Sequence, residues 1–201
     1  MPSLAAPLVF LRHGETDWNR QRLFQGSKDI VLNGTGQNQA RAHAAPLSYL
    51  LSEGVLERRQ ITLHSSPLQR ARQTAEILRD ALSLPSPVQC HTGLREISMG
   101  DWEGMTTESL RENHFALRKQ RRADRWHFTP PNGESMASRA EEIIKTARRL
   151  PPHSIVVTHS VVLRILLQHI NGGDKNAASR QNIPHEGAWL FDGEKMRHHS
   201  A

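Results

Sequence analysis

Short apolar segments that stop abruptly at polar residues constrain the fold of this chain more than any other feature of its sequence. Residues 7–11 read Pro-Leu-Val-Phe-Leu and are followed at once by Arg-His-Gly. This pattern is typical of a buried strand whose carboxyl end opens into a loop. Three more short runs, at 61–63, 88–90 and 155–158, are predicted to be strands of the same kind.

Segments with helical spacing of apolar residues separate these strands. After the second strand, Ser66 is expected to cap a helix that has Pro67 at its first position. Further helices are expected at about 35–51, 107–119, 135–150 and 160–170. Near the end, 188–191 and 195–197 flank Asp192-Gly193, which predicts a hairpin. The pair His198-His199 is expected to belong to a disordered end.

Strands that alternate with helices predict an α/β fold, a three-layer sandwich with a mainly parallel central sheet flanked by helices. The chain has 201 residues, enough for one sizeable core and fewer than two full domains usually need. We therefore expect a single domain over residues 1–201.

Polar side chains follow each predicted strand. Arg12 and His13 come after the first and Arg70 soon after the second, Glu96 follows the third, and His159 with Ser160 follows the strand at 155–158. In parallel sheets a ligand binds outside the carboxyl ends of the strands, so these groups are expected to converge in one crevice.

Phosphoryl transfer matches the chemistry of these groups. Guanidinium groups such as those of Arg12 and Arg70 pair with phosphate oxygens, and an arginine in the first turn of a helix adds the free N–H groups found there. A histidine between arginines is biased toward its neutral, nucleophilic form. A carboxylic acid such as Glu96 can protonate a leaving alkoxide and then deprotonate an attacking water.

Other phosphatase chemistries do not fit. A cysteine-dependent phosphatase needs an arginine six positions after its cysteine, but Cys90 is followed by Arg95, one position too early. The Asp-x-Asp of aspartyl-phosphate enzymes and the His-Glu-x-x-His of zinc proteases are both missing from the sequence. We expect no metal site and no cofactor.

The net charge of +6 favours anionic partners. Much of the basic charge lies in residues 111–125, where a solvated helix face is the favoured interpretation and a polyanion site the alternative. Few aromatic residues interrupt that segment, so nucleic acid is not expected as a partner. No apolar run has the roughly 18 residues of a membrane span, no signal-peptide pattern begins the chain, and Cys90 is the one cysteine. These features predict a cytoplasmic enzyme, either a monomer or a homodimer, acting on a small-molecule phosphate ester.

Five motifs follow one another along nearly the whole chain. They are Leu-Arg-His-Gly-Glu-Thr-Asp-Trp-Asn at 11–19, Ser-Ser-Pro-Leu-Gln-Arg-Ala at 65–71, Leu-Arg-Glu at 94–96 with Gly-Asp-Trp-Glu-Gly at 100–104, Pro-Asn-Gly-Glu-Ser at 131–135, and Val-Thr-His-Ser at 157–160. In this order they resemble the motifs of the histidine phosphatase superfamily, the phosphoglycerate mutase-like proteins.

The resemblance implies a role for each matching residue. His13 would be the phosphorylated histidine, Arg12, Arg70 and His159 would form the phosphate pocket, and Glu96 would be the proton donor. Four positions would line the substrate side of the pocket, namely Asn19, Gln25, Gly26 and Ser160. Asn19 and Ser160 also fit roles as a turn amide and a helix cap. Residues 105–132 are expected to be an insertion that covers the substrate.

Within the family, the chain resembles the phosphatases more than the cofactor-dependent mutases. Those mutases have Gly-Trp where this chain reads Gly26-Ser27, and they have Glu-Arg-His-Tyr-Gly where Glu96 here leads into Ile-Ser-Met-Gly. The insertion with which they close over a second phosphate has no evident counterpart, which favours hydrolysis by water. The alternatives are a cofactor-dependent phosphoglycerate mutase and a non-catalytic phospholigand-binding protein. Against the second, His13 and Glu96 are both present.

Overall fold

A six-stranded sheet forms the centre of the part of the protein that the computed structural model describes, residues 4–200. Residues 1–3 and 201 of the expected domain lie outside the described residues. The strands are β1 (Leu8–Arg12), β2 (Thr62–Ser65), β3 (Val88–Cys90), β4 (Ser154–Thr158), β5 (Ala188–Phe191) and β6 (Met196–His199). Their order is β3-β2-β4-β1-β5-β6. Strands β1 to β4 are mutually parallel, and β5 is antiparallel to both of its neighbours.

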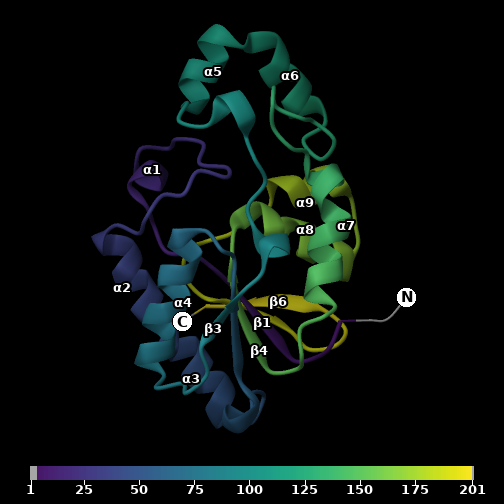
Figure 1. Ribbon diagram of the computed structural model, residues 1–201. Coiled ribbons are helices and arrows are strands. Elements are labelled where there is room, and N and C mark those ends of the chain that lie inside the picture. Colours follow the sequence, from purple (N-terminus) through teal and green to yellow (C-terminus); the bar gives the residue numbers. More distant parts are fainter. Residues whose placement is uncertain (1–3, 201) are drawn as a thin grey trace.

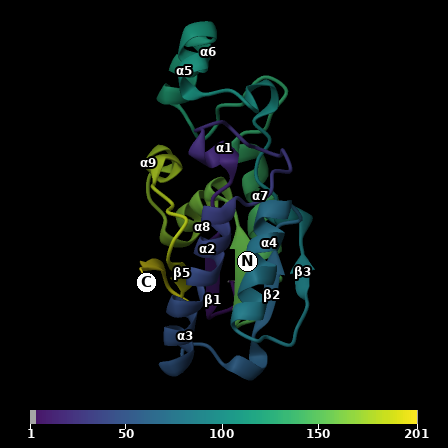
Figure 2. The same ribbon diagram turned by 90° about the vertical axis from the view of Figure 1, so that its left-hand side faces the viewer.

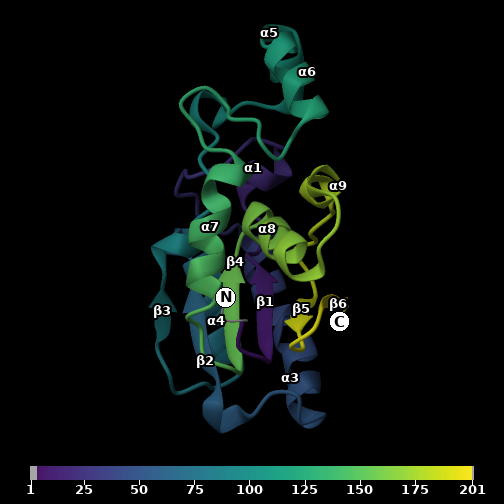
Figure 3. The ribbon, with the colours of Figure 1, turned by 90° about the vertical axis from the view of Figure 1, so that its right-hand side faces the viewer.

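Helices cover both faces of this sheet. The α-helices of the described residues are α1 (Asp17–Arg20), α2 (Gly34–Ala42), α3 (Ala44–Ser52), α4 (Gln69–Ala81), α5 (Thr107–Asn113), α6 (Phe115–Ala123), α7 (Met136–Ala147), α8 (Ser160–Asn171) and α9 (Lys175–Arg180), of which five lie over the sheet. Helices α2, α3 and α4 lie over one face, as Figure 2 shows, and α7 and α8 lie over the other (Figure 3). The predicted three-layer sandwich with a mainly parallel sheet is confirmed.

Two apolar cores lie on opposite sides of the sheet because successive strand side chains point to opposite faces. In β1, Leu8 and Phe10 pack into the core under α7 and α8, whereas Val9 and Leu11 pack into the core under α3 and α4. Each of these four side chains is fully buried. Burial on both faces explains why the sequence of β1 is uniformly apolar rather than alternating.

Two of the expected helices are each divided in two. The helix expected at 35–51 begins at Gly34 with the Asn33 side chain as its cap, and it is split into α2 and α3. Pro46 has no N–H to donate to the carbonyl four residues before it, so the hydrogen-bond ladder is interrupted there. The helix expected at 107–119 is split into α5 and α6 at His114, whose φ of −136° is not helical.

The carboxyl-terminal hairpin forms as predicted, but its end is ordered. His198 and His199, expected in a disordered tail, belong to β6 and pair with Trp189 and Ala188 of β5. The sequence around His198 and His199 does not indicate this pairing, because the hydrogen bonds that form it are made with the neighbouring strand β5.

Helices α5 and α6 stand beyond the carboxyl ends of the parallel strands, at the top of Figure 1. Within residues 4–200, no helix combines the length and hydropathy that crossing a bilayer requires.

Candidate active site

The pairing of β1 with β4 brings two histidines together. Arg12 lies opposite Thr158 in the parallel register, and the backbone N–H of His13 donates to Thr158 O over 3.0 Å. His13 and His159 each follow these paired residues directly, so both emerge at the same edge of the sheet. Their ring centroids are 5.1 Å apart.

His13 is held in one tautomer. Its Nδ1 lies 2.7 Å from Gly14 O, and a carbonyl oxygen only accepts, so Nδ1 carries the proton and Nε2 the lone pair. The side chain is 4% exposed. Burial lowers the pKa of His13 well below 6.5, and the neighbouring Arg70, His159 and Arg12 lower it further. The ring is therefore neutral at physiological pH.

His159 is fully buried, and Ser66 holds its ring. Its Nε2 lies 2.7 Å from Ser66 Oγ, and Nδ1 has no protein partner among the described residues. Ser66 Oγ also accepts the Leu68 N–H over 3.3 Å. The expectation that Ser66 caps the following helix is wrong, because α4 begins at Gln69 with Leu68 as its cap residue.

Backbone carbonyls fix both predicted phosphate-pocket arginines. Arg70, 1% exposed, donates from Nη2 to Gly26 O (2.8 Å) and from Nη1 to Lys28 O (2.6 Å), while Arg12 donates from Nη1 to Ile183 O (2.6 Å). The Nε atoms of both arginines are buried and have no protein partner in residues 4–200. Burial and the nearby Arg164 lower the pKa of Arg12 to about 10, so its guanidinium stays charged at neutral pH.

Glu96 is 7% exposed and accepts one backbone N–H on each carboxyl oxygen. Ile97 N donates to Oε1 (3.1 Å) and Val161 N donates to Oε2 (3.2 Å). Burial raises the pKa of Glu96 above 4.5, against the opposing effects of these N–H groups and of Arg70. The carboxyl group therefore keeps its proton to a higher pH than an exposed glutamate does.

A loop held by Glu103 forms one rim of the site. Glu103 Oε1 accepts the Ser27 N–H (2.8 Å) and the Met99 N–H (3.1 Å), together with the hydroxyls of Ser27 and Ser98. Gly26 has a φ of +51°, and an added Cβ there would collide with Glu103 Oε1 and would stand 2.6 Å from Met99 N. Only glycine fits at this position without displacing the rim.

A cavity of about 230 Å³ joins these groups. Of the predicted site residues, Arg12, His13, Asn19, Gln25, Gly26, Arg70, Glu96 and Ser160 line it. The exception, His159, lies beside the His13 ring without lining the cavity. Asn19 also has the turn role foreseen for it, since its Oδ1 accepts the Thr16 N–H.

Sequence reasoning missed two residues of the site. Arg164 lines the cavity from α8, and its position four residues after Ser160 puts both on one helix face, a signal that was available. His185 donates from Nδ1 to His13 O (2.7 Å) across 172 residues of chain, and no local signal indicated it.

The basic residues of 111–125 divide into two groups. Arg121 and Arg125 line the cavity. The other basic side chains of this segment do not line it, namely Arg111, His114, Arg118, Lys119 and Arg122.

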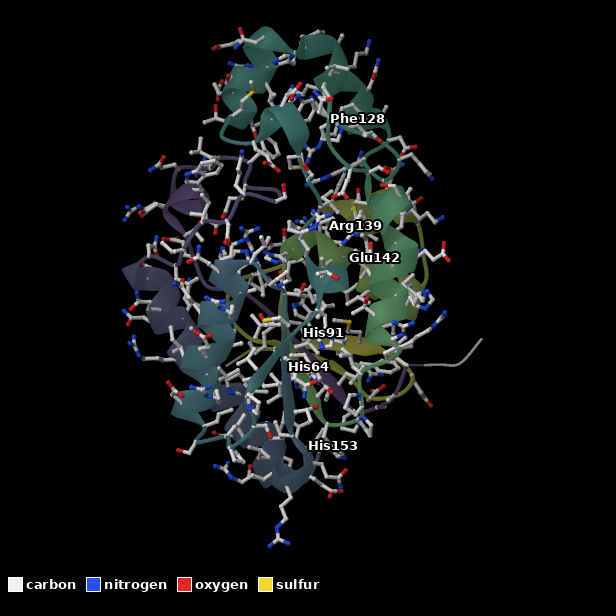
Figure 4. All side chains as sticks on the ribbon, viewed as in Figure 1. His64, His91, Phe128, Arg139, Glu142 and His153 are labelled. Carbon is white, nitrogen blue, oxygen red and sulfur yellow. The ribbon has the colours of Figure 1, made fainter. Side chains whose placement is uncertain are left out.

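Residues 4–200 contain no cluster of three or more His, Cys, Asp or Glu side chains arranged to hold a metal ion. His64 and His91 bond to each other (2.9 Å) lower on the sheet, away from α5 and α6 (Figure 4).

Comparison with known proteins gives one consistent family. Residues 8–191 match the model of the histidine phosphatase superfamily (branch 1). A phosphatase of Bacillus subtilis, PhoE, is 33% identical over 181 residues, which span 88% of this chain and 83% of the relative. A phosphoglycerate mutase of Schizosaccharomyces pombe is 31% identical over 182 residues, 86% of this chain and 83% of the relative.

Solved structures agree on the fold. A mycobacterial glucosyl-3-phosphoglycerate phosphatase in complex with VO3 superposes with a TM-score of 0.76 at 25% identity, covering 98% of both chains. The alpha-ribazole phosphatase of Shigella flexneri has a TM-score of 0.78 at 22% identity and covers 97% of this chain and 95% of its own. The second likeness, at that identity, concerns the fold alone.

Proposed function

Because this chain belongs to the histidine phosphatase superfamily (branch 1), we propose that it hydrolyses small-molecule phosphate monoesters through a phosphohistidine on His13. The observation that carries the proposal is the state of the His13 ring. Its Nδ1 is committed to Gly14 O, and Nε2 has no hydrogen bond among the described residues of the cavity that His13 lines. A neutral imidazole with a free lone pair beside two arginines is what nucleophilic attack on phosphorus requires.

In the first step, His13 Nε2 attacks phosphorus and the bond from phosphorus to the ester oxygen breaks. Arg12 and Arg70 neutralise the equatorial oxygens, and His159 contributes its Nδ1–H to the same group. Glu96 gives its proton to the departing alkoxide, so the alcohol leaves neutral and Glu96 becomes a carboxylate.

In the second step, a water molecule attacks the phosphohistidine on the side that the alcohol has vacated. The Glu96 carboxylate takes a proton from this water as the new P–O bond forms and the N–P bond breaks. Inorganic phosphate leaves, the Nε2 lone pair is restored, and Glu96 is protonated again. On this scheme Asn19, Gln25, Gly26 and Ser160 contact the substrate, and residues 105–132 cover it.

Hydrolysis rather than transfer back to an organic acceptor is supported by the sequence between Glu96 and Gly104. It lacks the Glu-Arg-His-Tyr-Gly element and the long closing insertion of the mutases. A phosphohistidine that water can reach is hydrolysed. Relatives of both kinds match the chain, so mutase activity is an outcome that the experiment must be able to detect.

The test is hydrolysis of para-nitrophenyl phosphate in excess EDTA by the wild type and His13→Ala. The matched control is His169→Ala, an exposed histidine near the opposite end of α8 from His159. We expect turnover in the wild type and the control and none in His13→Ala. Quenched wild-type protein should carry acid-labile phosphate on His13.

Turnover that survives in His13→Ala would overturn the proposal. So would phosphate transfer to a phosphoglycerate acceptor in preference to water.

A further inference from the structure

The backbone around His13 is anchored at three successive peptide units. In the first unit, between Arg12 and His13, the N–H donates to Thr158 O over 3.0 Å. The carbonyl oxygen of the same unit, Arg12 O, lies 3.2 Å from Nε2 of the buried His43. A carbonyl oxygen only accepts, so His43 Nε2 carries a proton and donates to it. Both polar groups of this unit are therefore held by other elements of the fold.

The second unit, between His13 and Gly14, is held by two side chains. Its carbonyl oxygen, His13 O, accepts a hydrogen bond from His185 Nδ1 over 2.7 Å. Its N–H, on Gly14, donates to Thr74 Oγ1 over 3.1 Å. Because a peptide unit is planar, a rotation of this one about the line between its two Cα atoms would break both bonds.

The third unit, between Gly14 and Glu15, sets the state of the His13 ring. Its carbonyl oxygen, Gly14 O, is the acceptor for His13 Nδ1, and its N–H donates to Gln39 Oε1 over 2.8 Å. An added Cβ on Gly14 would collide with Gly36 O, so only glycine fits between the second and third units. Glycine restricts its own dihedral angles less than any other residue. The direction of Gly14 O therefore depends on the hydrogen bonds of the neighbouring peptide units rather than on local sterics.

The segment that carries His185 also binds the residue before the proposed nucleophile. This segment runs from α9 back to β5, as Figure 3 shows. Arg12 Nη1 donates to Ile183 O over 2.6 Å, and His185 Nδ1 donates in the opposite direction, to His13 O. The two stretches of chain are thus joined by a pair of reciprocal hydrogen bonds. The contact that fixes the Arg12 side chain therefore also defines the position of His185.

The ring of His185 is half-buried and packs against the ring of His13. The two rings meet edge to face, with centroids 5.6 Å apart and planes inclined at 66°. Burial and the nearby Arg12 guanidinium lower the pKa of His185 to about 4, so its ring is neutral at physiological pH. Attack on phosphorus by a neutral imidazole that keeps its Nδ1 proton makes the His13 ring positively charged. A neutral His185 does not oppose that charge.

We propose that His185 is a positioning residue for His13. By holding His13 O, it fixes the peptide units that aim Gly14 O at His13 Nδ1 and so aim Nε2 at phosphorus. This role rests on the proposed phosphatase function of His13. His185 does not line the cavity, so it acts through His13 and not by contact with the substrate. A misplacement of about 1 Å can lower a rate about 100-fold, so the bond from His185 bears on the first chemical step rather than on substrate binding.

Three substitutions separate the hydrogen bond of His185 from its ring. His185→Asn places an amide N–H close to the position of Nδ1 and removes the ring, whereas His185→Phe keeps a ring beside His13 and removes the donor. His185→Gln, whose amide corresponds to Nε2 rather than to Nδ1, is a second variant without the donor. The matched control is His169→Phe, an aromatic replacement at an exposed position of α8. Thermal unfolding establishes which variants are folded at the assay temperature.

Single-turnover kinetics, with protein in excess over para-nitrophenyl phosphate, measure the first chemical step. We expect phenolate release to be roughly 10- to 100-fold slower in His185→Phe and in His185→Gln. His185→Asn should stay within about fivefold of the wild type, because it again offers a donor to His13 O. His169→Phe should match the wild type.

Two inhibitors distinguish positioning of the nucleophile from a general loss of the site. Inorganic phosphate binds without a bond to the ring of His13, so its inhibition constant in His185→Phe should stay within about threefold of the wild type. Vanadate takes a ligand from the attacking nitrogen and should lose affinity in proportion to the lost rate. An equal loss of affinity for both anions would indicate a structural role alone and would overturn the proposal.

The tautomer of His13 gives a readout that needs no turnover. In protein labelled with ¹⁵N at histidine, the His13 ring signals are identified by their absence from His13→Ala. The wild type should show His13 protonated at Nδ1 alone. In His185→Phe the shifts of the two ring nitrogens should move toward each other, because a loosened Gly14 O no longer selects one tautomer.

The two proposals fail separately. A folded His185→Phe or His185→Gln with the wild-type rate and the wild-type tautomer of His13 overturns the positioning role, and so does an equal loss in His185→Asn. If the wild type hydrolyses no ester, the phosphatase function fails, and the tautomer of His13 in these variants still decides whether His185 positions the ring.

Discussion

Glu96→Gln tests the proposed proton-transfer role of this residue against its structural role. In the wild type both carboxyl oxygens accept a backbone N–H, from Ile97 and from Val161. Glutamine presents an NH2 group at one of these positions, so one buried N–H loses its acceptor. An unsatisfied buried donor costs about 1–3 kcal/mol of unfolding free energy. Glutamine is therefore not a silent isostere at this site.

The catalytic loss should exceed what this structural change explains. General acid–base catalysis contributes about 100- to 10,000-fold to a rate, and the whole of it is removed when the carboxyl group is replaced. The loss in kcat/KM should be near the upper end for an alkyl phosphate, whose alkoxide needs a proton to leave. It should be smaller for para-nitrophenyl phosphate, whose phenolate leaves without one. The second step also loses its base, so para-nitrophenol should appear in a burst followed by slow turnover.

The assay is stopped-flow and steady-state kinetics on both esters, with thermal unfolding to confirm that the variant is folded at the assay temperature. Glu141→Gln, the same chemical change on the exposed side of α7, is the control. If Glu96→Gln keeps the alkyl ester's kcat/KM within about threefold of the wild type while folded, or loses equally on both esters without a burst, Glu96 is not the acid and base.

Three further predictions follow from the geometry of the site. The lowered pKa of His13 keeps its ring neutral, so the fall of kcat/KM on the acid side of the pH profile should lie below pH 6.5. The raised pKa of Glu96 should make kcat/KM fall again on the basic side, as rising pH removes the proton of Glu96. This basic limb should be missing from the Glu96→Gln profile, and an unchanged limb there would contradict the assignment. Ser66→Ala should lower kcat by roughly 3- to 10-fold through the lost His159 bond, with KM for para-nitrophenyl phosphate little changed; a change in KM alone would indicate a binding role instead. Glu103→Ala leaves two backbone N–H groups without their acceptor and should lower unfolding stability by roughly 2–4 kcal/mol in denaturant titration, whereas an unchanged midpoint would show that the rim loop holds without it.

The candidate site residues that lie at strand ends are predictable from the sequence, because local sequence patterns mark those strand ends. A short apolar run followed by Arg-His identifies a strand end, and parallel strands place their carboxyl ends at one edge whatever the details of packing. Arg12, His13, Arg70 and Glu96 therefore line one cavity as expected. Helix boundaries were less predictable, since Ser66 was expected to cap α4 but its hydroxyl contacts His159.

Which further side chains line the cavity depends on tertiary structure. Of the arginines of 111–125, Arg121 and Arg125 line the cavity. Arg121 lies over the rings of Phe24 and Trp102, which come from other segments of the chain. His185 reaches His13 only because the chain returns to the site after β4 and α8. The sequence alone determined which polar side chains stand at the ends of the strands, because an apolar run followed by polar residues marks a strand end. The tertiary structure decided which arginines outside the motifs line the cavity, because they belong to elements that meet only when the chain is folded.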